Sequence, residues 1–319
     1  MTDRPVITAV VLTYNEALHI RRCIERLRPL ADRIVVVDSF SDDGTVEIAR
    51  ELGADVLQNR FVNHARQFQW GIDNAAIEGG WVLRVDADEY FEDAAIAEIR
   101  ERLATLPAAV GAVEFRRKVF FQGKWIRWGG FYNNVLTRLW RAGAARIEQR
   151  WMDEHVVVER GETVRFSRGD LVDDNLKDIG WWTEKHVGYS VRQMIEFINL
   201  EHPELLGETA ESAAIRGTAK GRRFLRNGLY ARSPLYLRAV AYYVLRYVLR
   251  LGFLDGKTGF VFHSMQGFWY FLLIDWQIDQ ARRLIEKEGV EGLRDMLASR
   301  HGIRIGGTGQ AGAALPSAP

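Results

Sequence analysis

The 319-residue sequence predicts an α/β fold, in which a mainly parallel sheet is flanked by helices and followed by a C-terminal amphipathic helical region. Through residues 6–103, short apolar segments alternate with segments of helical periodicity. The short segments are apolar throughout, which is typical of parallel strands covered on both faces. Polar residues follow these strands at their carboxyl ends, where the ligands of such sheets bind.

The individual elements follow from hydrophobic periodicity. Strands are predicted at residues 6–12, 34–37, 55–57 and 81–85. Helices are predicted at residues 16–27, 45–52, 65–76 and 93–103; in the first of them Ala17, Ile20, Ile24 and Leu27 recur at helical spacing. Further strands are predicted at residues 113–121, 135–140 and 156–158.

Length and composition limit the organisation of the chain. We expect a domain at residues 1–165, a helical region at 166–305 and a disordered tail at 306–319, rich in Gly, Ala and Pro. With 43 Lys and Arg against 42 Asp and Glu, overall charge does not indicate a nucleic-acid partner. The lone cysteine, Cys23, lies in a helical apolar pattern, which favours a core position over a nucleophile and fits a reducing compartment.

Asp86 and Asp88 follow the strand at 81–85 and are separated by one residue. Alternate side chains of a strand share a face, so the two carboxylates begin on the same side of the sheet. Mg²⁺ and Mn²⁺ prefer one or two carboxylates, together with water and substrate phosphates, over a complete protein cage. The pair therefore predicts a divalent-cation site against a diphosphate. The alternative is an acidic loop that caps the helix at 93–103.

Polar residues also follow the first two strands. Asp38 ends the second strand as an isolated carboxylate that can accept a hydrogen bond from the imide N–H of a base, with Thr13 and Glu16 beside it across the sheet. Residues 39–45 supply a turn and a helix N-cap. A dinucleotide fold is disfavoured, because neither Gly-x-Gly-x-x-Gly after the first strand nor a Walker motif is present.

These segments carry a family resemblance. In order along the chain they read VVLTYNEALHIRRCIERL, IVVVDSFSDDGTVEIA and WVLRVDADEY. They resemble the nucleotide-sugar half of family 2 inverting glycosyltransferases of the GT-A fold, and more narrowly the lipopolysaccharide-core and exopolysaccharide β-glucosyltransferases. The match is specific from residue 6 to residue 90. It continues more loosely through GKWIRWGGFYNNVLTRLWR and RWMDEHVVVE.

The resemblance implies roles for individual residues. It implies that the uridine of a UDP-sugar is held by Thr13, Tyr14, Glu16 and Asp38, and that Asp86 and Asp88 bracket the metal and the diphosphate. It also places Arg66 and Gln67 near the nucleotide. Arg138 is a candidate for contact with the pyrophosphate, and a solvated or structural ion pair is the alternative for it.

An inverting transfer needs one general base to take the proton of the acceptor hydroxyl. The adjacent acids Asp153 and Glu154, before the strand at 156–158, are the candidates. Neighbouring residues of an extended chain point to opposite sides, so only one of them can face the sugar. Related enzymes often have His-Glu here, which favours Glu154. This chain has Asp153 at the His position and His155 after Glu154, so the choice stays open.

Residues 215–254 combine basic, aromatic and aliphatic side chains and contain no acidic residue. The basic residues are Arg216, Lys220, Arg222, Arg223, Arg226, Arg232, Arg238, Arg246 and Arg250. We expect the arginines to reach lipid phosphates and the aliphatic side chains to enter the acyl boundary, which predicts peripheral binding to an anionic membrane. For the glycosyltransferase that the motifs resemble, the expected location is the cytoplasmic face of the inner membrane. The alternatives are a helical pair packed on the catalytic domain and a dimer interface.

The expected function is that of a metal-dependent glycosyltransferase. It would move a hexose from a UDP-sugar to a lipid-linked, lipopolysaccharide or exopolysaccharide acceptor, with Mg²⁺ or Mn²⁺. A nucleotidyltransferase is the alternative, because that class also combines an α/β sheet with an acidic metal site. Such enzymes typically carry a Gly-rich basic loop after the first strand, whereas here residues 13–16 read TYNE. A non-catalytic membrane module would leave the Asp-x-Asp pair without a purpose.

Overall fold

The computed structural model describes residues 5–152, 154–206 and 233–305. The chain divides into two compact units, Met1–Glu148 with Asp153–Asp178, and Gln149–Met152 with Ile179–Pro319. The first unit thus extends past residue 165, where the sequence suggests a boundary. The predicted disordered tail, residues 306–319, lies outside the described residues, as do the basic residues from 216 to 232.

The first unit is built on one large sheet with the strand order β3-β2-β1-β4-β8-β6-β12-β5. These strands are β1 (Ile7–Thr13), β2 (Arg33–Asp38), β3 (Asp55–Gln58), β4 (Trp81–Asp86), β5 (Glu89–Phe91), β6 (Val110–Phe121), β8 (Val135–Arg141) and β12 (Leu171–Asp174). Strands β3, β2, β1 and β4 are parallel, and β8 joins β4 and β6 in antiparallel pairing. The carboxyl ends of β1, β2 and β4 therefore meet at one edge.

Smaller strands and the helices complete the first unit. The strands are β7 (Lys124–Trp125) and β11 (Glu162–Arg165), both paired with β6, and the separate pair β9 (Ala145–Ile147) and β10 (Val156–Val158). The helices are α1 (Ala17–Leu27), α2 (Thr45–Glu51), α3 (His64–Asn74), α4 (Asp93–Arg102) and the 3₁₀ turn η1 (Leu103–Thr105). The predicted α/β fold is confirmed. The sequence pattern did not reveal the short strands β5, β7, β9, β11 and β12.

Both faces of the parallel strands are buried, because alternate residues of each strand enter different cores. Ala9 and Val11 of β1 join the core formed with α1, α2 and α4. Val10, between them, joins the core formed with α3 and β9. Cys23 of α1 is fully buried in the first of these cores, and burial raises the pKa of its thiol, so it is an inert core residue as expected.

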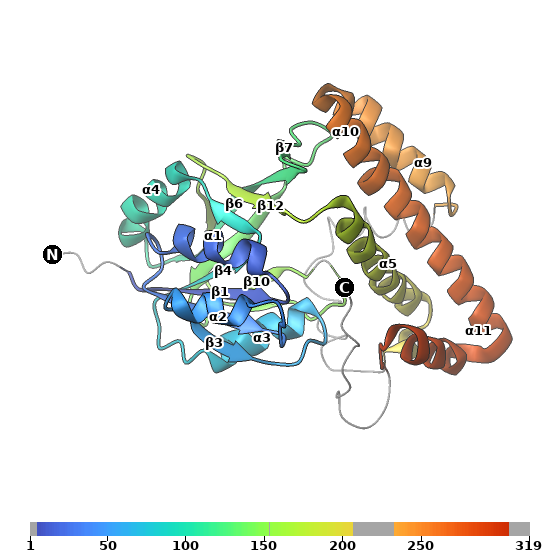
Figure 1. The fold of residues 1–319 in the computed structure, drawn as a ribbon, viewed down its shortest axis with the longest axis horizontal. Coiled ribbons are helices and arrows are strands. Elements are labelled where there is room, and N and C mark those ends of the chain that lie inside the picture. The colour runs from blue at the N-terminus through green and yellow to red at the C-terminus, as the bar shows by residue number, and fades with distance from the viewer. Residues whose placement is uncertain (1–4, 153, 207–232, 306–319) are drawn as a thin grey trace. The chain divides into compact units, whose positions relative to one another are not determined.

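The second unit is helical. Its elements are α5 (Ile179–Glu201), η2 (Pro203–Leu205), α9 (Leu237–Tyr243), the π-helical segment η4 (Val244–Leu249), η5 (Gly252–Asp255), α10 (Gly256–Phe262), the π-helical segment η6 (His263–Trp269) and α11 (Tyr270–His301) (Figure 1). Met194 and Ile198 of α5 pack with Ile274 and Ile278 of α11 in its core. Across the described ranges, we find no helix with the length and apolarity needed to cross a bilayer.

Two arginines of this unit differ from the expectation that they reach lipid phosphates. Arg238 on α9 is buried and forms an ion pair with Asp275, whose Oδ1 lies 2.7 Å from Arg238 Nε. Arg246 on η4 is also buried, with its guanidinium 5.2 Å from the centre of the Tyr242 ring. The expectation was wrong for these two residues because a basic residue counted in a sequence need not lie on the exposed side of its helix.

A buried histidine makes the stability of the second unit depend on pH. Burial lowers the pKa of His186 on α5 to about 4, and its ring stacks on Trp182. An unfolded histidine titrates near 6.5, so stability that is complete above pH 6.5 is lost as the pH falls toward 4. We expect His186 to contribute a loss of about 2 kcal/mol by pH 5. Thermal unfolding at pH 7 and pH 5 tests this, because His186→Phe should reduce the difference; an unchanged difference contradicts it.

Candidate functional site

The loop after β2 is organised around Asp38. This carboxylate is fully buried and accepts hydrogen bonds from Thr13 Oγ1 (2.9 Å), the backbone N–H of Ser41 (2.9 Å), Ser41 Oγ (2.5 Å) and Gln58 Nε2 (3.3 Å). A carboxylate offers about four acceptor positions, so these donors fill them. Thr13 and Asp38 are thus brought together as expected. A base that bonded directly to Asp38 would have to displace one of these donors.

Helix α3 places Gln67 and Arg66 in different environments. Gln67 is buried, and its Nε2 donates to Ser39 Oγ and to the Asn59 carbonyl, both at 3.1 Å. It therefore ties the loop after β2 to the loop after β3. Arg66 is exposed at the start of the helix, where its backbone N–H donates to the N-cap Asn63. Its side chain is open to a ligand, whereas Gln67 has a supporting position.

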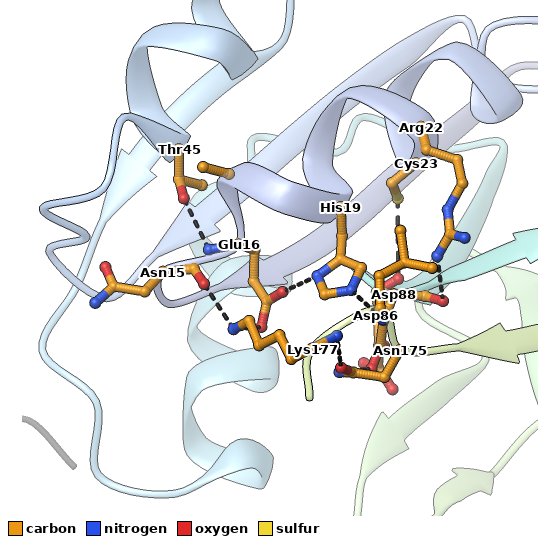
Figure 2. Close-up of polar contacts among 12 residues, drawn as sticks. Asn15, Glu16, His19, Arg22, Cys23, Thr45, Asp86, Asp88, Asn175 and Lys177 are labelled. Carbon is orange, nitrogen blue, oxygen red and sulfur yellow. Dashed lines mark hydrogen bonds and ion pairs between the residues drawn. The ribbon is translucent and has the colours of Figure 1, made fainter. Parts of the chain in front are cut away.

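The loop after β1 ends in a charged network at the start of α1 (Figure 2). Glu16 Oε2 lies 2.5 Å from His19 Nδ1, and Glu16 Oε1 lies 3.2 Å from Lys177 Nζ. His19 is fully buried, and its Nε2 accepts the backbone N–H of Leu176 at 2.8 Å. Because Nε2 accepts, the proton of the neutral ring lies on Nδ1 and is donated to Glu16. Neither His19 nor Lys177 was predicted from the sequence as a site residue.

A five-residue segment, residues 174–178, contacts both the loop after β1 and Asp88, which follows β4. We call this segment the strap. Its Asn175 donates to Asp88 Oδ2 at 2.9 Å, and its Lys177 Nζ donates to the Asn15 carbonyl at 2.7 Å (Figure 2). Arg22 of α1 fixes the beginning of the strap through Asp174 Oδ2 at 2.6 Å. The strap therefore holds the loop after β1 and the Asp88 carboxylate in a fixed relation.

Asp86, at the end of β4, is held in its ionised form. Burial would raise its pKa, but Arg138, Arg84 and His64 together hold the pKa well below its usual range. Its side chain is still 37% exposed. Burial raises the pKa of the neighbouring Glu89 to about 8, although Arg138 opposes that shift. Asp86 therefore carries a negative charge where a ligand can reach it.

Arg138 on β8 is buried and contacts both of these acids. Its Nη2 lies 2.5 Å from Glu89 Oε1 and 3.3 Å from Asp86 Oδ2. The structure gives Arg138 a buried structural ion pair, which sets the orientation of Asp86.

The carboxylates of Asp86 and Asp88 fit a divalent cation by their donor chemistry. They are hard oxygen donors, Asp86 is ionised, and Asn175 orients Asp88. No group of three or more His, Cys, Asp or Glu side chains in the described part of the chain is arranged to hold a metal ion. Two carboxylates suit a cation that takes its remaining ligands from water and substrate phosphates.

Glu154 reaches the same face of the sheet from a different part of the chain. Its Oε1 lies 2.6 Å from Arg84 Nη2, and Arg84 precedes Asp86 by two residues on β4. Burial would raise the pKa of Glu154, but Arg84 and His64 lower it, so this carboxylate is ionised at neutral pH. Asp153, the other predicted base, lies outside the described residues.

The first unit matches a known family. Residues 8–163 match the model of glycosyl transferase family 2. The chain carries a family 2 glycosyltransferase domain. The parallel strands β3, β2, β1 and β4, continued by the antiparallel strand β8, form the sheet of this domain. The family that the sequence motifs resemble is thus confirmed for this part of the chain.

Curated relatives are similar to part of the glycosyltransferase domain. An uncharacterized glycosyltransferase of Rickettsia bellii is 39% identical over 83 residues, which cover 26% of this chain and 28% of the relative. The succinoglycan biosynthesis protein ExoA of Rhizobium meliloti is 34% identical over 112 residues, which cover 32% of this chain and 33% of ExoA. The similarity thus spans about a third or less of these relatives.

Solved structures are also similar to part of the chain. Glucosyl-3-phosphoglycerate synthase from Mycobacterium tuberculosis, in complex with Mn²⁺ and UDP-glucose, is 23% identical, with 37% of this chain and 44% of that chain covered and a TM-score of 0.30. Mannosyl-3-phosphoglycerate synthase from Rubrobacter xylanophilus is 22% identical, with 36% and 40% covered and a TM-score of 0.29.

The strap gives the glycosyltransferase domain a testable dependence on Lys177. Lys177→Met removes the ammonium that holds the Asn15 carbonyl and Glu16, so the loop after β1 should relax. We expect the KM for the sugar donor to rise by roughly 10-fold, with a smaller change in kcat. Lys118→Met is the matched control, because Lys118 is paired with Glu92 outside the site. Equal KM values for the two variants would contradict the role of Lys177.

Proposed function

We propose that this protein is an inverting glycosyltransferase that moves a hexose from a UDP-sugar to a hydroxyl group of a lipid-linked saccharide, in the biosynthesis of lipopolysaccharide or exopolysaccharide. The observation that carries the proposal is the arrangement at the carboxyl edge of the sheet. There the β1 and β2 loops, which suit a nucleoside, lie beside the ionised Asp86, and the strap connects Asp88 to the loop after β1.

The donor is bound along this edge in the proposed mechanism. Tyr14 and Glu16 of the β1 loop contact the uridine, and Asp38 fixes the neighbouring β2 loop through Thr13 and Ser41. Asp86 and Asp88 would hold Mg²⁺ or Mn²⁺ through their carboxylate oxygens. When bound, the cation would offset the negative charge that develops on the departing diphosphate. Arg138 keeps Asp86 oriented from below.

Glu154 is the proposed general base. The acceptor oxygen forms a bond to the anomeric carbon while the bond from that carbon to the diphosphate oxygen breaks, and the hydroxyl proton passes to the Glu154 carboxylate. The ion pair with Arg84 keeps Glu154 ionised and therefore able to accept a proton, but it also lowers the basicity of the carboxylate. The pair must loosen when the acceptor hydroxyl approaches.

A screen of nucleotide sugars tests the function. UDP-glucose and other UDP-hexoses are offered with Mg²⁺ and with Mn²⁺, together with a membrane lipid extract, and lipid products are analysed by mass spectrometry. A mass increase of one hexose with release of UDP is expected. Release of pyrophosphate from a nucleoside triphosphate, with no hexose transfer, would favour a nucleotidyltransferase instead.

We further propose that the protein acts peripherally at the cytoplasmic face of the inner membrane, because a lipid-linked acceptor is presented there to a water-soluble donor. The exposed aliphatic residues of the second unit support this location.

A further inference from the structure

The helix formed by α9 and η4 exposes aliphatic side chains and buries charged ones. Its exposed side chains are aliphatic and recur every three or four residues: Leu237, Val240, Val244, Leu245, Val248 and Leu249. Its buried side chains include the charged Arg238 and Arg246. A helix at a water-facing surface normally does the opposite, because water solvates guanidinium groups well and aliphatic groups poorly.

The buried arginines are accommodated by specific contacts. Arg238 pairs with the fully buried Asp275 of α11, and its guanidinium lies 5.0 Å from the centre of the Phe197 ring. Arg246 lies against Tyr242, and burial lowers its pKa. Charges held in this way fix the orientation of the helix, since rotating it would place the arginines outside and break the pair with Asp275.

The chain then turns and continues the apolar surface. Leu251, Phe253 and Leu254 around η5, and Phe260 and Val261 of α10, are all exposed. The turn is tightly packed, because a Cβ on Gly252 would lie 2.9 Å from the Arg246 carbonyl oxygen and one on Gly259 would lie 2.4 Å from Asp255 Cβ. The apolar side chains are thus exposed although the backbone that carries them is tightly packed. We call residues 237–262 the apolar hairpin.

The charges of the apolar hairpin match an anionic surface. Its exposed charged residues are Arg250 and Lys257, and its one acidic residue, Asp255, is buried. A second copy of the chain, docked through the same face, would offer these cations no exposed carboxylate of the hairpin, because Asp255 is buried. Anionic lipid headgroups instead complement them, while the aliphatic side chains reach the acyl boundary.

We propose that the apolar hairpin lies in the interface of an anionic bilayer, with its aliphatic face in the acyl boundary and with Arg250 and Lys257 at the phosphates. The helix of 13 residues from Leu237 to Leu249 is about 20 Å long, too short for a hydrocarbon core of about 30 Å. It therefore binds one leaflet. This inference rests on the proposed membrane location. It differs in the force that holds the protein there: because Arg238 and Arg246 are buried, insertion of the aliphatic side chains is the main attraction.

Vesicle sedimentation tests the proposal with the full chain and vesicles of phosphatidylcholine and phosphatidylglycerol. We expect wild-type protein to stay bound in 0.5 M NaCl, and the triple variant Leu245→Gln, Leu249→Gln, Phe253→Gln to bind at least 10-fold more weakly. The three side chains are exposed, so the fold should be kept. Leu200→Gln, another exposed leucine in the same unit, is the matched control and should bind like wild type.

A probe of insertion completes the test. Leu249→Cys can be labelled selectively with an environment-sensitive dye, since the native Cys23 is buried. A blue shift of the dye on adding vesicles is expected. Equal binding of the triple variant and wild type, complete release by salt, or a lipid-free dimer that the triple variant dissociates would each overturn the proposal. Hydrolysis of the UDP-sugar by the wild-type protein in solution is measured in parallel. Vesicle binding without any such hydrolysis would count against the proposed function and not against the role of the apolar hairpin.

Discussion

Asp88→Ala is expected to lower kcat/KM for sugar transfer on the order of 10³-fold, because one of the two carboxylates proposed to hold the cation against the diphosphate is lost. The affinity for UDP should fall in the presence of Mn²⁺ and stay unchanged without metal. Calorimetric titration with UDP, with and without Mn²⁺, measures this difference. The distinction between the two conditions separates loss of a metal ligand from general damage to the loop that Asn175 supports.

Asp93→Asn is the control for this experiment. Asp93 is a nearby exposed acid at the start of α4, where it pairs with Arg26. Its variant should behave like wild type in both titrations. Unchanged turnover in Asp88→Ala would remove the metal assignment of this residue.

Glu154→Gln is expected to lower kcat by roughly 10²-fold or more while donor binding stays near normal. Glutamine keeps the shape and can still accept a hydrogen bond from Arg84, but it cannot take up the proton of the acceptor hydroxyl. Steady-state kinetics with donor and acceptor varied separately give the two quantities. If Asp153→Asn shows the loss and Glu154→Gln does not, Asp153 is the base.

The parallel strands could be predicted because both of their faces are buried, which makes their residues apolar throughout. Val10 and Val11 are both buried, on opposite faces, so the strand has no polar face that would make its pattern ambiguous. The position of Asp86 followed directly from the strand that ends there. For the same reason the pairing of Thr13 with Asp38 was foreseeable from two neighbouring strand ends.

The strap could not be predicted because its contacts are distant in sequence. Asn175 meets Asp88, and Lys177 meets Asn15, across 87 and 162 residues. No periodic pattern marks such a segment. His19 gave one local signal, its position three residues after Glu16 on a helix, which allows the two side chains to meet.

The orientation of the α9 and η4 helix was not predictable from composition. Its aliphatic stripe and its arginines are both visible in the sequence, but periodicity says only that the two faces differ. Which face is buried depends on Asp275, a partner 37 residues from Arg238.

The position of β12 has a consequence for how the domain is made. This strand lies between β6 and β5, so β5, at residues 89–91, has no strand on that side until residues 171–174 exist. On a ribosome, strands β1 to β4 can pack early, but the segment that carries Asp88 and β5 stays without its partner strand and without the strap until residue 178 has left the exit tunnel. A shortened chain that ends near residue 163, where the family match ends, would therefore lack both β12 and the strap, and Asp88 would lose its contact with Asn175.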